Sequence, residues 1–168
     1  MRTAVRVAIV LLTVTVLERG LASQLRIDGA AADLLLLMAI AGGMVGGPDH
    51  GAIVGFFAGL SLDLLVQTPL GLGALVYCIT GYLVGLAQSA VVRSSRLQPV
   101  FLAAAASVFG IGLYVLVSLV VGRSGLINQH LLVVIAVVAG VNALLIPVAN
   151  RAMRWALGDS SNLRAAVR

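Results

Sequence analysis

Charged residues are scarce in this chain of 168 residues, since 10% of the residues are charged and 61% are hydrophobic. Soluble globular domains carry about 25% charged residues, so this composition excludes an ordinary soluble domain. The single cysteine, Cys78, excludes an internal disulfide, and its place in an apolar run favours a small buried side chain. Lysine is absent. The net charge of +5 therefore comes from arginines, whose placement relative to a membrane matters more here than attraction to nucleic acid, and no nucleic-acid partner is expected.

Candidate metal ligands and catalytic groups are also few. The two histidines, His50 and His130, are predicted on opposite sides of the membrane and so cannot share a metal ion. The acids Asp33, Asp49 and Asp63 are predicted at different depths on different elements, whereas metal-dependent lipid transferases need clustered acids. We therefore expect no bound metal, no cofactor and no enzymatic activity.

Long apolar runs take up most of the chain, whose mean hydropathy is +1.11. Runs of this kind, bounded by charge, glycine or proline, predict membrane-spanning helices. The sequence thus predicts an all-α, polytopic membrane protein of about six transmembrane helices. The six runs are Ala4–Leu17, Asp33–Gly47, Gly51–Val66, Leu70–Val92, Pro99–Val121 and Leu131–Ala149.

The second and third runs are shorter than the roughly 17 to 25 residues that a full span needs. They form either two crossings or one re-entrant hairpin with its tip at residues 46–49, and both alternatives return the chain to the same side. Two crossings are favoured because residues 30–32, all alanine, can extend the second helix backward. That extension places Asp33 in the first turn of the helix, where the helix dipole favours an acid.

Arginines gather on one side of the predicted membrane. With six spans, eight arginines lie on the side of the termini and three on the other, which predicts cytoplasmic termini and an outward loop over residues 18–32. The first run resembles a signal peptide, but the residues after it make no convincing cleavage site, so a retained helix is expected. We expect one transmembrane domain over residues 1–157 and a short cytoplasmic tail over residues 158–168.

The most informative pattern is a ladder of glycines that leads to an acid inside an apolar run: Gly51, Gly55, Gly59 and then Asp63. Residues four apart share one face of a helix, so the ladder forms a strip without side chains that can pack closely against another helix. An acid near the end of such a helix is expected to have a cationic or hydrogen-bonding partner. With the glycine-rich fourth run, the third run is expected to form the most tightly packed part of the molecule.

Polar side chains elsewhere in the runs are expected to serve packing. Ser61 follows the ladder without a histidine predicted at its depth, and small hydroxyl groups are common between membrane helices. Asn142 is expected to form a hydrogen bond between helices. Tyr77 and Tyr82 have amphipathic rings that fit either a groove or plain packing.

The ladder and the residues after it resemble the MreD family, the rod-shape-determining membrane proteins of bacteria. The resemblance lies in a glycine ladder that ends in Gly-Leu-Ser-Leu-Asp, then Pro-Leu-Gly, then a tyrosine and glycine region, and it covers about 35 residues. The motif residues that it assigns to partner binding or helix packing are Gly51, Gly55, Gly59, Asp63, Pro69, Gly71, Tyr77, Gly81, Tyr82 and Gly85.

The resemblance implies a non-enzymatic component of the cell-elongation machinery in the bacterial inner membrane. It implies a complex with the bitopic protein MreC, the actin-like MreB, the glycosyltransferase RodA and a class B penicillin-binding transpeptidase. It also implies a fold similar to the substrate-binding S components of energy-coupling-factor transporters.

Two functions follow from these patterns. In the first, the glycine strip receives the transmembrane helix of MreC, and Asp63 fixes the register of that helix or pairs with an arginine. In the second, the chain is a vitamin-binding S component, with Thr80, Ser107 and Asn142 as its few polar groups inside the spans. Membrane lipid is a further expected partner, as is a second copy of the chain that pairs through the same strip.

Overall fold

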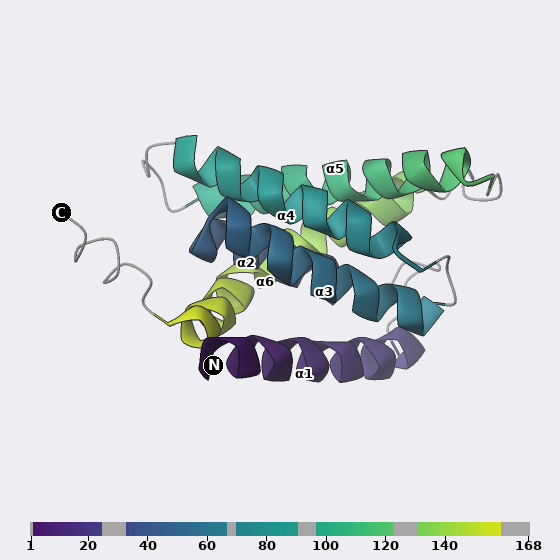
Figure 1. Ribbon diagram of the computed structural model, residues 1–168. Coiled ribbons are helices and arrows are strands. Elements are labelled where there is room, and N and C mark those ends of the chain that lie inside the picture. The colour runs from purple at the N-terminus through teal and green to yellow at the C-terminus, as the bar shows by residue number, and fades with distance from the viewer. Residues whose placement is uncertain (1, 25–32, 67–69, 91–96, 123–130, 159–168) are drawn as a thin grey trace.

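Six α-helices account for most of the chain that the computed structural model describes, which comprises residues 2–24, 33–66, 70–90, 97–122 and 131–158. Successive helices run in opposite directions, so that α1 begins and α6 ends at the same end of the bundle (Figure 1). The prediction of an all-α protein with six helices is confirmed. The helices are α1 (Arg2–Gln24), α2 (Leu34–Gly46), α3 (Pro48–Val66), α4 (Leu72–Ala90), α5 (Gln98–Val120) and α6 (Leu131–Leu157).

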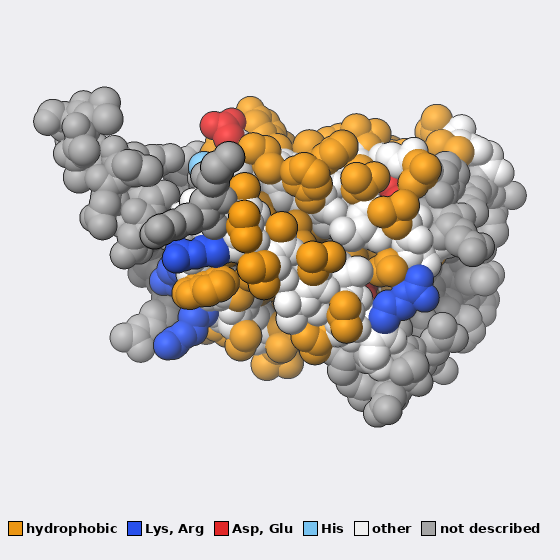
Figure 2. Space-filling model, turned by 60° about the horizontal axis from the view of Figure 1, so that its bottom comes forward, with side chains coloured by type: hydrophobic (Ala, Val, Ile, Leu, Met, Phe, Trp, Pro, Cys, Tyr) orange, Lys and Arg blue, Asp and Glu red, His pale blue; other side chains and the backbone are white. Residues whose placement is uncertain are grey.

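Four of these helices, α3 to α6, are long and apolar enough to cross a membrane among the described residues. Their outward sides carry large hydrophobic side chains such as Leu64, Phe101 and Leu144, each about 70% exposed or more. Figure 2 shows hydrophobic side chains over much of one face of the molecule. A soluble protein would not expose so much apolar surface, so these sides of the helices face lipid.

Helix α2 forms the centre of the core although it is the shortest of the six. It has 13 residues, which rise about 20 Å, less than the roughly 30 Å of a bilayer interior. Its residues from Leu35 to Met44 are all buried, because α1, α3, α4, α5 and α6 all contact it. A helix that is apolar on every side can be buried in this way.

The corner between α2 and α3 is a single residue, Gly47, with φ of 85°. Glycine adopts this backbone conformation without the steric cost that a side chain brings. Pro48 then begins α3, a position where its fixed φ suits a helix and its missing N–H is not needed. Asp49, expected at the tip of a turn, therefore lies with His50 in the first turn of α3.

Several predicted helix ends differ from the structure. The outward loop was expected to begin at Glu18, but α1 continues to Gln24, because Glu18 and Arg19 are themselves good helix formers. Asp33 is the N-cap of α2 instead of a residue of its first turn, and its carboxylate accepts a hydrogen bond of 2.8 Å from the Leu36 amide. The three alanines at 30–32, Pro69 and the tail after residue 158 lie outside the described residues.

Candidate functional site

The glycine ladder of α3 packs directly on the backbone of α4. A Cβ atom added to Gly51, Gly55 or Gly59 would lie closer than 3.0 Å to the carbonyl oxygen of Gly81, Tyr77 or Gly73, respectively. Real Cβ atoms essentially never approach another heavy atom so closely. The prediction that the third and fourth helices form a tightly packed hairpin is confirmed.

The expectation that this strip receives the helix of another protein is wrong in the described structure, because α4 of the same chain occupies it. The facing strip of α4 has the same spacing of four, Gly73, Tyr77, Gly81 and Gly85, and Gly85 meets the Gly47–Pro48 corner. Antiparallel helices with matching small residues approach along their whole length. The motif is therefore an internal seam, and a partner helix has to bind elsewhere.

Asp63 is held by the first turn of α4. Its carboxylate, 1% exposed, accepts hydrogen bonds from the backbone amides of Gly71 at 2.9 Å, Gly73 at 2.9 Å and Ala74 at 3.3 Å. These amides lie at a helix N-terminus, where the backbone lacks internal acceptors and the helix dipole favours an anion. The expected hydrogen-bonding partner is thus the start of α4, and Asp63 caps the neighbouring helix.

Glycines in this connection make the capping geometry possible. Gly71 has φ of 103°, a conformation that favours glycine, and it donates to Asp63 just before α4 begins. A Cβ atom on Gly73 would lie 2.6 Å from a carboxylate oxygen of Asp63. Both glycines of the sequence Pro-Leu-Gly-Leu-Gly are therefore explained by the carboxylate that they surround.

The two motif tyrosines have different environments. Tyr77 is 2% exposed, and its hydroxyl group donates a hydrogen bond to the carboxylate of Asp33 at the start of α2. Glu18 of α1 lies beside Asp33, and one of its carboxylate oxygens has no hydrogen-bond partner among the described residues. Tyr82 is 42% exposed, so it lies on the surface of α4. Of these two tyrosines, Tyr77 is the one that links α4 to the start of α2 in the interior.

A cavity of about 190 Å³ adjoins the Asp33 carboxylate. Tyr77 and Tyr114 line it together with apolar side chains of α2, α3, α5 and α6. Its polar groups all lie at the end of the bundle where α2 and α4 begin. Thr80, Ser107 and Asn142, the polar groups that would have lined a vitamin site, line neither this cavity nor the groove described below.

Replacing Tyr77 with phenylalanine is expected to lower the free energy of unfolding by about 2 kcal/mol, because the Asp33 carboxylate loses a hydrogen bond in a buried site. Thermal unfolding in detergent measures the change. Tyr82→Phe is the matched control, since its ring is exposed. Equal unfolding temperatures for the two variants would show that the Tyr77 hydroxyl does not stabilise the bundle.

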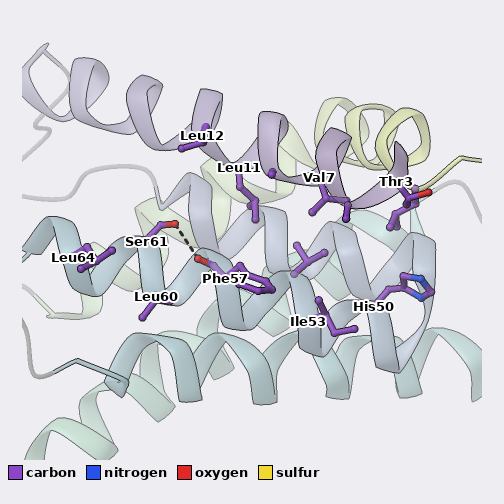
Figure 3. Close-up of a pocket in the computed structure, with 14 residues that line it drawn as sticks. Thr3, Val7, Leu11, Leu12, His50, Ile53, Phe57, Leu60, Ser61 and Leu64 are labelled. Atoms are coloured by element: carbon purple, nitrogen blue, oxygen red, sulfur yellow. Dashed lines mark hydrogen bonds between the residues drawn. The ribbon is translucent and has the colours of Figure 1, made fainter. Parts of the chain in front are cut away.

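An apolar groove of about 690 Å³ lies between α1 and α3 (Figure 3). Along α3 it extends from His50 to Leu64, which corresponds to about 20 Å of helix. Side chains from α1, including Val7 and Leu11, point into it from the other side, and Leu157 of α6 also lines it. Its polar groups are few: Ser61 donates to the Phe57 carbonyl at 2.9 Å, and Thr3 and His50 lie together at one end.

Two arginine contacts of α1 lie near the two ends of the helix, one to α6 and one to α3. Near its start, the guanidinium group of Arg6 lies 5.4 Å from the ring centre of Trp155 on α6. Near its other end, Arg19 donates a hydrogen bond of 3.2 Å to the carbonyl of Leu65 at the end of α3. Between these contacts α1 and α3 stand apart, and the apolar groove lies in that space. No sequence motif marked it, because ordinary apolar residues line it.

The remaining polar candidates serve packing, as expected. Asn142 of α6 donates a hydrogen bond of 3.0 Å to Ser107 of α5, and both side chains are fully buried. This confirms the predicted hydrogen bond between helices. Within the described part of the chain, no three histidine, cysteine or acidic side chains form a possible metal site.

Comparison with known proteins gives one match. The model of the family described as rod shape-determining protein MreD matches residues 1–149. No curated protein and no solved structure matches the chain. The similarity to transporter S components therefore stays a prediction.

Proposed function

Because this chain belongs to the MreD family of rod shape-determining membrane proteins, we propose that it is a non-enzymatic scaffold that binds MreC in the bacterial inner membrane. In this role it helps to couple MreB filaments to peptidoglycan synthesis by RodA and a class B penicillin-binding transpeptidase. Membership of this family favours the scaffold over the vitamin-binding alternative. The observation that carries the proposal is the open apolar groove between α1 and α3.

The groove suits the single transmembrane helix of MreC better than the glycine seam does. It runs along two membrane helices for about 20 Å, so the occupant presents a continuous apolar face to it. Large side chains border it, including Ile53 and Phe57, which are 55% and 52% exposed. A helix packed there would cover these side chains by interdigitation, which is a main source of helix association in lipid.

The placement of charge supports cytoplasmic termini. Arg6, Arg151 and Arg154 belong to the end where α1 begins and α6 ends, whereas Arg19 lies near the other end of α1. Arginines favour the cytoplasmic side of membrane proteins. In the proposed orientation, the Asp63 cap and the Asp33–Tyr77 hydrogen bond lie toward the outer side.

Filling the groove tests this function. Ala8 of α1 lines the groove, and Ala8→Phe is expected to reduce the MreC that co-purifies with the protein about tenfold, which corresponds to about 1.4 kcal/mol. Ala105→Phe is the matched control, because Ala105 is an exposed residue of α5 away from the groove. Equal recovery of MreC with both variants, each folded by size-exclusion chromatography, would contradict binding in the groove.

A further inference from the structure

We propose that the α1–α3 groove binds one anionic phospholipid, with an acyl chain between the two helices and the phosphate at the end where α1 begins. The inference goes beyond the proposed function: the lipid chain and a partner helix would use the same space, so the lipid occupies the groove only while no helix is bound there. It does not depend on which partner helix binds.

The chemistry of the groove changes along its length. Apolar side chains line most of it. Apart from Ser61, its polar lining residues are Thr3 and His50, which lie together at one end. An apolar channel that ends in a polar group matches the shape of a lipid with one chain inserted and its headgroup at the interface. His50 uses Nδ1 for a contact of 3.1 Å with the Gly46 carbonyl, which leaves Nε2 as the nitrogen farther from the backbone.

Three arginines lie close in sequence to residues at this end of the groove. Arg6 lies within one turn of the lining residues Thr3 and Val7, and Arg154 lies three residues before Leu157. Arg151 is one turn earlier on α6, and all three arginines are exposed. Figure 2 shows some of the arginine side chains at one side of the orange surface and another at the opposite side.

Asp49 is the one acid among the described residues of this end, so the local charge favours an anion. Guanidinium groups bind phosphate oxygens in pairs of hydrogen bonds, and basic sites between membrane helices on the cytoplasmic side recognise anionic headgroups. A zwitterionic lipid would bring its own cation and lose this attraction. The groove therefore selects for headgroup charge.

Trp155 reports on this site because it is the only tryptophan in the chain and lies under Arg6. The full-length protein is reconstituted without MreC in phosphatidylcholine bilayers that contain a few per cent of brominated phosphatidylglycerol or brominated phosphatidylcholine. Bromine quenches tryptophan fluorescence only at short range. From the quenching of Trp155 fluorescence, we expect an apparent affinity for phosphatidylglycerol that is about tenfold higher than that for phosphatidylcholine.

Three variants separate a groove site from general attraction to the surface. Arg154→Gln is expected to remove most of the preference, whereas Arg19→Gln, at the other end of α1, is expected to keep it. Ala8→Phe, which fills the groove, is expected to remove it, and Ala105→Phe to keep it. Mass spectrometry of the wild-type complex is expected to find about one retained phosphatidylglycerol.

Equal quenching by the two lipids in the wild-type protein would overturn the proposal. So would a preference that survives Ala8→Phe, because the lipid would then lie around the protein and not in the groove. Loss of MreC binding is measured separately by co-purification, so failure of the lipid site and failure of the helix site give different results.

Discussion

Replacing Gly55 with leucine is expected to prevent the chain from folding, whereas replacing Gly140 with leucine is expected to leave it folded. A Cβ atom at Gly55 would meet the backbone of Tyr77 on α4, and backbone cannot move aside as a flexible side chain can. Overpacking costs about 1 to 3 kcal/mol where neighbours can shift and more where they cannot, and a whole leucine side chain in the seam separates α3 from α4 along its length. The yield of monodisperse protein in detergent and its unfolding temperature measure the effect.

Gly140 is the matched control because it lies in α6 with no atom within 4 Å of an added Cβ atom. The two substitutions add the same side chain to a membrane helix, so their difference reports the seam alone. If Gly55→Leu folded normally and lost only MreC binding, the strip would have to face a partner, contrary to the structure. The same result for both glycines would show that backbone approach does not limit packing here.

Replacing Asp63 with alanine is expected to have the second largest effect and to destabilise the bundle by about 3 kcal/mol. The amides of Gly71, Gly73 and Ala74 would lose their carboxylate acceptor in a buried place, and unsatisfied amides are costly there. Asp63→Asn keeps a carbonyl oxygen as an acceptor but loses the charge. The unfolding temperature of Asp63→Asn should therefore lie between that of Asp63→Ala and that of the wild type.

Asp49 supplies the control for this experiment. It is also an acid in α3 of the same hairpin, but it is exposed in the first turn of that helix. Asp49→Ala should change the free energy of unfolding by about 0.5 kcal/mol, the usual size of an exposed charge at a helix terminus. Equal losses at both positions would contradict a capping role for Asp63. Hydrogen exchange at the start of α4 provides an independent measurement.

The sequence revealed the class of protein and the special residues, but not what those residues contact. Hydropathy runs located all six helices, since lipid requires long apolar segments with internally bonded backbones. The ladder and Asp63 stood out because glycine and an acid are unusual in such segments. A glycine strip accepts any helix, however, and its spacing does not say whether that helix belongs to the same chain. The connection between α3 and α4 is short, which favours packing of α4 on the strip over packing of a helix from another chain.

Other features had no local signal at all. The groove between α1 and α3 depends on how α1 packs against α2 and α6 and on the contacts of Arg6 and Arg19, all with residues distant in the sequence. Similarly, nothing in residues 34–46 alone indicates that this helix lies at the centre. Its hydrophobicity is equal on all sides, and only the later helices decide what surrounds it. Such tertiary arrangements are not encoded in local periodicity.

The central position of α2 has a consequence for how the protein is made in the cell. This helix is synthesised before α4, α5 and α6, which cover much of its surface. At about 20 Å it is too short to rest stably across a bilayer alone, so it has to enter the membrane as a hairpin with α3. The burial of α2 is complete only when α6 has been made, because α6 is one of the helices that cover it.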